Sequence, residues 1–463
     1  MRKILTALSM FLLCACSVGP DYIRPTTPVH DHWNVEYQTA ANLANTQWWR
    51  QFGDPVLDGL IETAVRENLD MKIAAARVDQ YLGVLDTTRS QYFPQISANY
   101  TGSGQRQPGL PAESHQATVN ASWELDLWGR IRRSSEAAQA QIIGSDAGRR
   151  GVLMTLVANV ASGYLTLKGL DRQLEVTRAT ENAYAESLKL FQLRFQYGTV
   201  SQLEVSQSES QYEAARQSIP SYESQIRQQE NLISLLLGRP PGPIPRGKRL
   251  DELTPPGIPA GLPSELLERR PDIIQAEQTL IAANAQIGVA KAAYFPKISL
   301  TGALGVAGSD IGKLFVPGAD IWSLGGQVAA PLLNFGAISG QVKQAEAQQQ
   351  QAMFQYQQAI LTGFREVEDA LIKTAKGREQ LEAQKRQVQA LEEYARLSRL
   401  QFEAGTSNYL QVLDADRSLF SGRLAFNQTK FDLLTAIVSV YKSMGGGWDT
   451  EADKLNLPNE KKP

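Results

Sequence analysis

Few residues of the chain are spaced in a way that could support catalysis or hold a metal ion. Two of its three histidines form a His30-x-His32 pair, but no third ligand lies near them in the sequence, which favours a polar loop over a zinc site. The Gly302-x-x-Gly305-x-x-Gly308 pattern has the wrong spacing for a dinucleotide-binding turn and falls in a strand-like stretch. No nucleotide loop and no recurring pair of acid and base is present. We therefore predict no catalytic residues, no metal site and no enzymatic activity.

The start of the chain has the pattern of an export signal that ends in a cysteine. A positively charged pair of residues precedes a short apolar run at 4–13, and a small residue stands directly before Cys16. This segment resembles the bacterial lipobox, in which the cysteine is acylated and becomes the new N-terminus. The other cysteine, Cys14, lies in the same segment, so the exported chain would have one thiol and no disulfide. We expect residues 1–15 to be removed and Cys16 to carry a covalent lipid in place of any cofactor; an ordinary signal peptide is the alternative.

The overall charge excludes one class of partner. Lys and Arg number 46 and Asp and Glu number 48, which gives a formal net charge of −2. A chain that binds nucleic acid through phosphate contacts has an excess of basic residues. We therefore expect no binding to nucleic acid.

The chain contains an internal duplication. The Tyr-Phe-Pro motif that begins at Tyr92 recurs at Tyr294, and Gly198-Thr199 recurs as Gly405-Thr406. The second repeat has a small insertion between these two motifs, which is typical of a surface loop whose length can vary. The expected organisation, in chain order, is a signal peptide at 1–15, an N-terminal acylated segment at 16–54, repeat 1 at 55–238, a proline-rich connector at 239–271, repeat 2 at 272–447 and a C-terminal tail at 448–463.

Each repeat contains a segment that predicts two strands, at about 93–127 and 296–333. Apolar and small or polar residues alternate along them, as Ile298 and Leu300 do with Ser299. Each run reaches the roughly 9–11 residues of a tilted membrane strand, although a half-buried sheet of a soluble domain gives the same alternation. Four strands cannot close a barrel, and open sheet edges do not occur in hydrocarbon, so other subunits must complete the sheet. The other apolar positions are Ile96, Ala98, Tyr100, Val119, Ala121, Trp123, Leu125, Leu127, Leu304, Val306, Trp322, Leu324 and Val328.

The segments that follow the strands predict long helices. No proline occurs from 130 to 197, which at ~1.5 Å per residue allows a rod of roughly 100 Å, and leucines recur there every seven residues as in a coiled coil. The rods end where Ser201 and Asn408 have the side-chain chemistry of helix N-caps. We expect helices at about 130–236 and 336–444, each folded into a long hairpin.

Together these features closely resemble the TolC-like outer-membrane efflux lipoproteins of the OprM/NodT branch. The similarity extends over nearly the whole chain, and its motifs are specific only in combination. The stretches that carry it are Cys16-Ser17, Pro20-Asp21-Tyr22, Arg24-Pro25, Trp48-Trp49, Phe52, Asp54-Pro55, Leu262 to Leu267, Arg269-Arg270-Pro271-Asp272-Ile273, Tyr294 to Ser299 and Gly445-Gly446-Gly447-Trp448.

The resemblance implies a mainly helical chain with a membrane β part, which forms a homotrimer with a 12-stranded β-barrel continued by a 12-helix α-barrel. It implies a lipid-anchored protein of the cell outer membrane that extends into the periplasm and passively conducts substrates. Its partners would be outer-membrane lipid, a periplasmic adaptor and an inner-membrane pump of the resistance-nodulation-division type. The adaptor would contact the hairpin tips at Gly198-Thr199 and Gly405-Thr406. A plain helix C-cap also accounts for both glycines.

The resemblance also places a gate just beyond the second tip. Leu410 and Asp414 match the family's closing residues and share one helical face, so three copies would form an apolar ring and an acidic ring. Asp416 and Arg417 are expected to bond between subunits. The alternative is that Asp414 is a solvated surface charge.

A lipid-anchored periplasmic coiled-coil scaffold without a pore is the competing interpretation of the chain. Its alternating segments would be ordinary hairpins that bury their apolar residues against the chain's own helices. The two interpretations therefore differ in the exposure of Ile298, Leu300, Trp322 and Leu324.

Overall fold

A computed structural model describes residues 17–25, 47–107, 110–258 and 269–446. The chain divides into two compact units, the first made of 1–28, 76–148 and 272–359 and the second of 29–75, 149–271 and 360–463. The predicted signal peptide, Cys16, the His30-x-His32 pair and the C-terminal tail lie outside the described residues.

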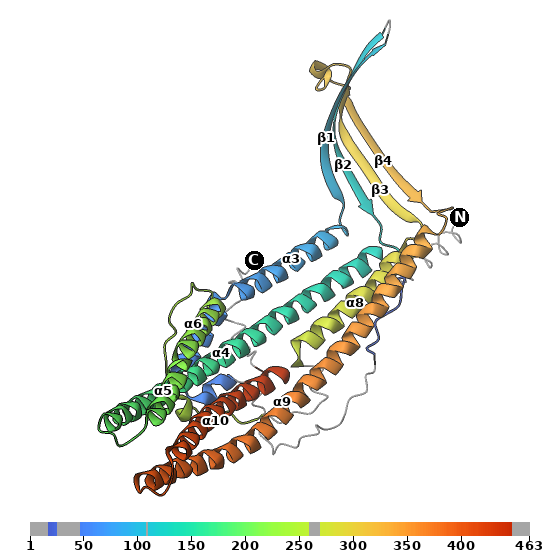
Figure 1. Cartoon of the computed structure of the whole chain (residues 1–463). Helices are drawn as coiled ribbons and strands as arrows, with labels where there is room; N and C mark the ends of the chain where they lie inside the picture. The colour runs from blue at the N-terminus through green and yellow to red at the C-terminus, as the bar shows by residue number, and fades with distance from the viewer. Residues whose placement is uncertain (1–16, 26–46, 108–109, 259–268, 447–463) are drawn as a thin grey trace. The chain divides into compact units, whose positions relative to one another are not determined.

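The first unit contains one antiparallel sheet in the order β1-β2-β3-β4, which is also the order of the strands along the chain (Figure 1). The chain enters and leaves the sheet at one end, where it joins the helices, and turns at the other. The strands are β1 (Gln95–Gln107), β2 (Leu110–Glu124), β3 (Lys297–Gly308) and β4 (Asp320–Ala329).

The register of the sheet places apolar side chains on one face. Val119 pairs with Leu304, and Leu304 pairs with Trp322, while the neighbouring row pairs Asn120 with Ala303 and Ala303 with Ser323. Because side chains alternate between faces along a strand, the pairing separates an apolar face from a polar one, as predicted.

This apolar face is open to the surroundings of the chain. Trp322 is 75% exposed and Leu324 is 81% exposed, and Leu300 is also exposed, while Ile298 near the start of β3 is half-buried. The chain therefore does not bury this face against its own helices, so the scaffold interpretation, which required that burial, is wrong. An exposed apolar face of this extent needs an apolar environment.

The helices of the first unit pack through small side chains. Ala137 and Ala140 of α4 lie buried against Ala282 and Ala285 of α8, which lets the two backbones approach closely. The unit contains parts of α3 (Leu69–Ser90), α4 (Arg130–Gln196), α8 (Pro271–Ala292) and α9 (Ala337–Glu403).

The second unit holds the largest hydrophobic core. Leu153, Val160 and Leu167 of α4 are fully buried, and Trp48 stacks on Tyr441 with 5.0 Å between ring centroids. Among the described residues α4 alone is long and apolar enough to cross a membrane, but 67% of its apolar window is buried, as in a core helix. The other elements are η2 (Trp48–Phe52), α2 (Pro55–Glu67), α5 (Gln202–Arg216), α6 (Ser218–Leu236), η3 (Leu250–Glu252) and α10 (Tyr409–Ser443).

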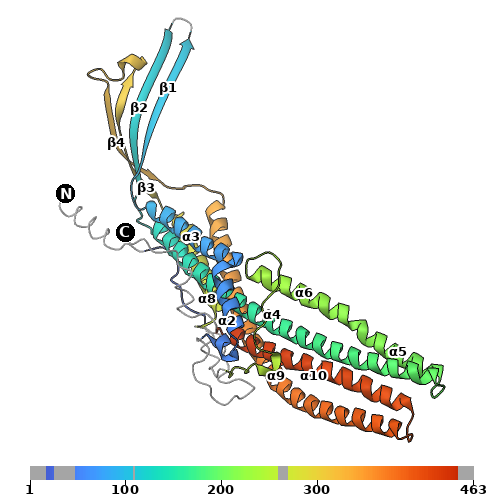
Figure 2. The same cartoon turned by 90° about the vertical axis from the view of Figure 1, so that its left-hand side faces the viewer.

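The returning helices of the two hairpins differ. In repeat 2, α10 is continuous, whereas the corresponding segment of repeat 1 is interrupted at Gln217 between α5 and α6 (Figure 2). Pro220 accounts for the interruption, because it cannot donate the backbone hydrogen bond that the carbonyl of Arg216 would accept. Apart from this break, the predicted fold of paired strands and long helical hairpins is confirmed.

Candidate functional site at the ends of the helical hairpins

The two hairpins of the second unit turn with the same backbone geometry. At the end of α4, Gly198 has a φ of 71° and donates to the carbonyl of Phe195, while Thr199 donates to that of Arg194. Gly405 at the end of α9 has a φ of 74° and makes the equivalent bonds. This is the Schellman C-cap, in which a residue with positive φ satisfies the last carbonyls of a helix.

Both returning helices begin at the predicted caps. The backbone N–H of Ser201 donates to the Glu204 carboxylate over 2.5 Å, and the side chain of Asn408 accepts from the backbone N–H of Gln411 over 3.3 Å. These bonds satisfy backbone donors at the helix starts. Gly198 and Gly405 have open space where a side chain would be, so their backbone conformation alone selects glycine.

An aromatic cluster joins the two hairpins close to their ends. The ring centroids of Phe191 in α4 and Tyr409 in α10 lie 4.1 Å apart, and Phe402 lies 5.4 Å from Tyr409. Val205 of α5 and Val412 of α10 are buried in the same cluster. The ends of both hairpins therefore pack as one body within the second unit.

Leu410 lies beside this cluster but does not enter it. Its neighbours Tyr409, Val412 and Leu413 are buried, whereas Leu410 is 60% exposed. Its counterpart in repeat 1, Leu203, is 66% exposed. An exposed leucine on each returning helix is available for contact with another chain.

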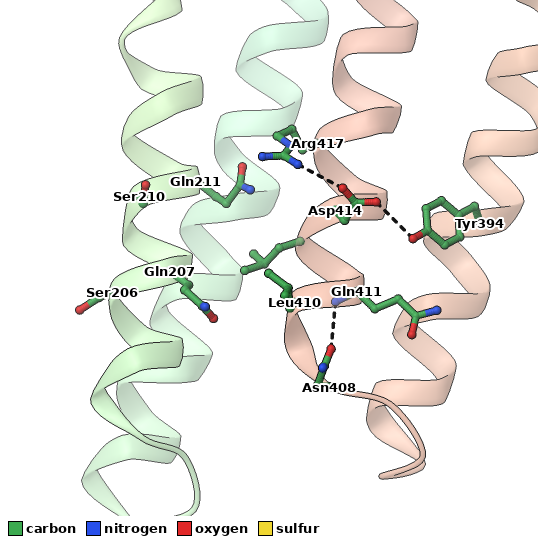
Figure 3. Close-up of a pocket in the computed structure, with 11 residues that line it drawn as sticks. Ser206, Gln207, Ser210, Gln211, Tyr394, Asn408, Leu410, Gln411, Asp414 and Arg417 are labelled. Atoms are coloured by element: carbon green, nitrogen blue, oxygen red, sulfur yellow. Dashed lines mark hydrogen bonds and ion pairs between the residues drawn. The ribbon is translucent and has the colours of Figure 1, made fainter.

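Asp414 is the charged residue one turn further along α10. Its carboxylate pairs with Arg417 on the same helix over 3.1 Å and accepts a hydrogen bond from the Tyr394 hydroxyl of α9 over 3.3 Å (Figure 3). Half of the Asp414 side chain remains exposed, so it is a surface charge with two partners rather than a freely solvated one.

Asp416 points to a different neighbour. It pairs with Arg399 of α9 over 3.1 Å, and its side chain is only 16% exposed. Burial raises the pKa of the Asp416 carboxyl, against the opposing effect of the Arg399 charge. Burial, and then the charge of Asp416, raises the pKa of Tyr184, whose hydroxyl is also buried. Arg417 and Asp416, predicted to bond between subunits, thus each have an ionic partner within the chain.

A groove of about 740 Å³ separates the two hairpins at this level. Its α5 wall is polar and uncharged, while its α10 wall carries Leu410, Asp414 and Arg417 (Figure 3). The charged side chains of this groove therefore come only from repeat 2, although the turns and caps of the two hairpins are alike. The α5 side chains in the groove are Ser206, Gln207, Ser210 and Gln211.

Two contacts of the site were missed by the sequence analysis. Tyr394 and Arg399 of α9 hold Asp414 and Asp416, and neither belongs to a motif. For Tyr394 the available signal was its distance from the turn, because residues about equally far from Gly405 on the two helices of a hairpin lie near each other. Arg399 gave no such signal, because it lies much nearer to Gly405 in the sequence than Asp416 does.

The described residues contain no group of three or more His, Cys, Asp or Glu side chains that could hold a metal ion. His115 lies on the sheet, where its Nδ1 is 2.9 Å from the Tyr100 hydroxyl and its Nε2 is 3.9 Å from Glu113. These contacts are those of a polar side chain on a strand.

The sequence matches one protein family in two stretches. The family model described as outer membrane efflux protein matches residues 60–239 and 262–446. The chain is 36% identical over 466 residues to the toluene efflux pump outer membrane protein TtgC of Pseudomonas putida, covering 97% of this chain and 96% of that protein. It is 33% identical over 457 residues to the cation efflux system protein CusC of Escherichia coli, covering 96% and 99%.

Solved structures with the same fold include a membrane protein of Pseudomonas aeruginosa. The TM-score is 0.85 at 32% identity, over 93% of this chain and 100% of that one. The open state of the MtrE outer membrane channel of Neisseria gonorrhoeae gives a TM-score of 0.86 at 29% identity, over 94% and 99% of the two chains.

Proposed function

Because the chain belongs to the outer membrane efflux protein family, we propose that three copies of it close into one exit duct. The chain is an outer-membrane efflux channel, and its family is one of transport channels. In the proposed assembly the duct conducts passively, and the work comes from an inner-membrane pump of the resistance-nodulation-division type. A periplasmic adaptor protein connects the pump to the duct.

The open sheet carries the proposal of a trimer. Its four strands expose an apolar face, and within the described residues β1 and β4 each have a neighbour on one side only. Unpaired backbone groups are too costly to remain in hydrocarbon, so both edges require partners. Pairing β4 of one copy with β1 of the next satisfies both edges, and three copies give a barrel wide enough for water.

The mass and the conductance of the purified protein test this assembly. We expect the detergent-solubilised protein to have the mass of three chains and to conduct ions in planar bilayers. A monodisperse single chain without conductance would contradict both the closed barrel and the duct.

The gate is proposed to lie at Leu410 and Asp414. Both side chains line the α10 wall of the groove, and both are at least half exposed in the single chain. In the proposed trimer the three leucines form an apolar constriction and the three carboxylates an acidic ring. Arg417 and Tyr394 fix the Asp414 side chain, while Asp416 and Arg399 tie α10 to α9.

The hairpin tips are the proposed contact of the adaptor. Gly198, Thr199, Gly405 and Thr406 form the two turns, and each threonine hydroxyl donates to a carbonyl of the preceding helix. The two tips therefore present similar, rigid backbone surfaces to a partner. Their similarity favours an adaptor that repeats the same contact on both hairpins.

The contacts of residues 17–25, which we call the strap, favour the proposed lipid on Cys16. The backbone N–H of Val18 donates to the carbonyl of Trp128 over 3.1 Å, and Arg133 pairs with Asp21 over 2.6 Å. Because Trp128 closely follows the end of β2, these bonds hold the strap beside the base of the sheet. A lipid on the preceding residue would therefore begin close to the base of the sheet.

Metabolic labelling with palmitate tests the lipid anchor. We expect the label in the unaltered protein and in Cys14→Ser, and its loss in Cys16→Ser. The Cys16→Ser protein should still reach the membrane, because the strands contribute most of the apolar surface that inserts. Equal labelling of all three proteins would refute the lipid at Cys16.

A further inference from the structure

The loop that connects β3 to β4 is a folded element with its own hydrogen bonds. The backbone N–H of Ala307 donates to the carbonyl of Ala319 over 2.8 Å, which closes the loop at its base. The Asp310 side chain accepts from the backbone N–H of Gly312 over 2.8 Å and caps a single helical turn, η5 (Ile311–Lys313). We call residues 309–319 the rim loop.

The rim loop directs large apolar side chains outward. Phe315 is 87% exposed, and Ile311 and Val316 are also exposed, whereas Leu314 and Ala319 are buried. The loop thus buries some of its apolar side chains and leaves the largest of them exposed. Within the described part of the single chain, nothing covers that surface.

Gly308 shows on which face of the sheet the rim loop lies. It follows Leu304 and Val306 at intervals of two residues, so its side-chain position belongs to the apolar face. A Cβ built at Gly308 would lie 3.2 Å from the backbone oxygens of Asp310 and Lys313. The turn from Asp310 to Lys313 is therefore folded over the apolar face, and the rim loop continues that face.

The height of the rim loop also matches the outer edge of the apolar band. Gly308 pairs with His115, whose ring is hydrogen-bonded to Tyr100 on the same face. Aromatic side chains with polar tips are typical of the level at which a barrel leaves the membrane. The β1–β2 hairpin continues past this level, as Figures 1 and 2 show, and the next residue of β2 on the apolar face, Glu113, is charged and exposed.

We propose that the rim loop inserts Ile311, Phe315 and Val316 among the lipid acyl chains of the outer leaflet. The continuity with the apolar face and the position at its edge favour lipid over water. They also favour lipid over a second copy of the chain at the mouth of the duct, because the loop is folded outward. The loop would anchor the extracellular end of β3 and β4 as the acylated cysteine anchors the opposite end. This inference rests on the proposed membrane barrel.

Nitroxide labels attached to single cysteines test the insertion. Phe315→Cys, Leu304→Cys and Ser103→Cys are labelled in the full-length protein, which is then reconstituted in vesicles of phosphatidylethanolamine and phosphatidylglycerol. We expect the label at Phe315→Cys to collide with oxygen several-fold more than with a water-soluble nickel complex, as at Leu304→Cys. The label at Ser103→Cys should show the opposite preference. The unaltered chain, carried through the same labelling, gives the background.

Each other outcome overturns the proposal in a recognisable way. A Phe315→Cys label that prefers the nickel complex, with Leu304→Cys still in lipid, would place the rim loop in water. A label shielded from both reagents and broadened by neighbouring labels would place the loops against one another at the mouth of the duct. If Leu304→Cys also preferred the nickel complex, the membrane face itself would be wrongly assigned.

Discussion

Replacement of Leu410 by alanine is expected to open the periplasmic end of the channel. If three copies of Leu410 meet at the constriction, each loses part of the roughly 1.5–3 kcal/mol that burial of a leucine side chain provides. The ratio of closed to open channels falls about tenfold for each ~1.4 kcal/mol by which the closed state is destabilised. The loss in three chains is therefore large enough to make the open state prevalent.

Single-channel recording and antibiotic entry measure this opening. We expect a several-fold higher conductance for Leu410→Ala in planar bilayers, and greater sensitivity to large antibiotics in cells that carry it. The matched control is Leu203→Ala, which removes a similarly exposed leucine from repeat 1, whose side chains in the groove carry no charge. It should leave both measurements close to those of the unaltered protein.

Asp414 has a separate expected effect. Three carboxylates near the axis raise the local concentration of cations, so Asp414→Asn should reduce cation preference with little change in total conductance. Asp416→Asn serves as its control, because that carboxylate faces Arg399 and is mostly buried. Unchanged conductance and antibiotic entry in Leu410→Ala would move the constriction elsewhere and leave Asp414 as an ion-paired surface residue.

Arginine at Leu324 is expected to prevent assembly, whereas arginine at Ser323 is not. The two residues are neighbours on β4, but the register places Leu324 on the apolar face and Ser323 on the polar face. An arginine that faces lipid near the midplane costs about 2–4 kcal/mol per chain, and each trimer would contain three. The yield of heat-stable trimer in outer-membrane extracts measures this cost.

Conductance separates the two faces further. Ser323→Arg should assemble normally and change the conductance, because its side chain would enter the lumen. If the two variants assembled equally well, the apolar face would not be in contact with lipid, and the membrane barrel would be disproved.

The sequence predicted those features that depend on short-range patterns. Alternation along the strands identified both faces of the sheet, and the register of Val119, Leu304 and Trp322 agrees with it. The caps at Ser201 and Asn408 were also predictable, because turn glycines and N-cap residues act on the adjacent backbone. Both repeats contain such a turn glycine and such a cap, so both hairpins were predicted.

Features that depend on contacts between distant segments were not predicted. The partners of Asp414 and Asp416 come from the other arm of the hairpin, and the bond between Tyr22 and Glu277 joins the strap to α8. Such pairs follow from how helices rotate and align, which periodicity does not specify. The break at Gln217 was predictable in principle from Pro220, but repeat 2 suggested one continuous helix.

The aromatic cluster of Phe191, Phe402 and Tyr409 reduces the number of parts that can move independently. It couples the α4–α5 hairpin to the α9–α10 hairpin, so a force that displaces either tip also displaces the other. In the proposed trimer the six hairpins that surround the opening would therefore move as three rigid pairs, one pair in each chain. A force applied by one adaptor contact per chain would be sufficient to dilate it.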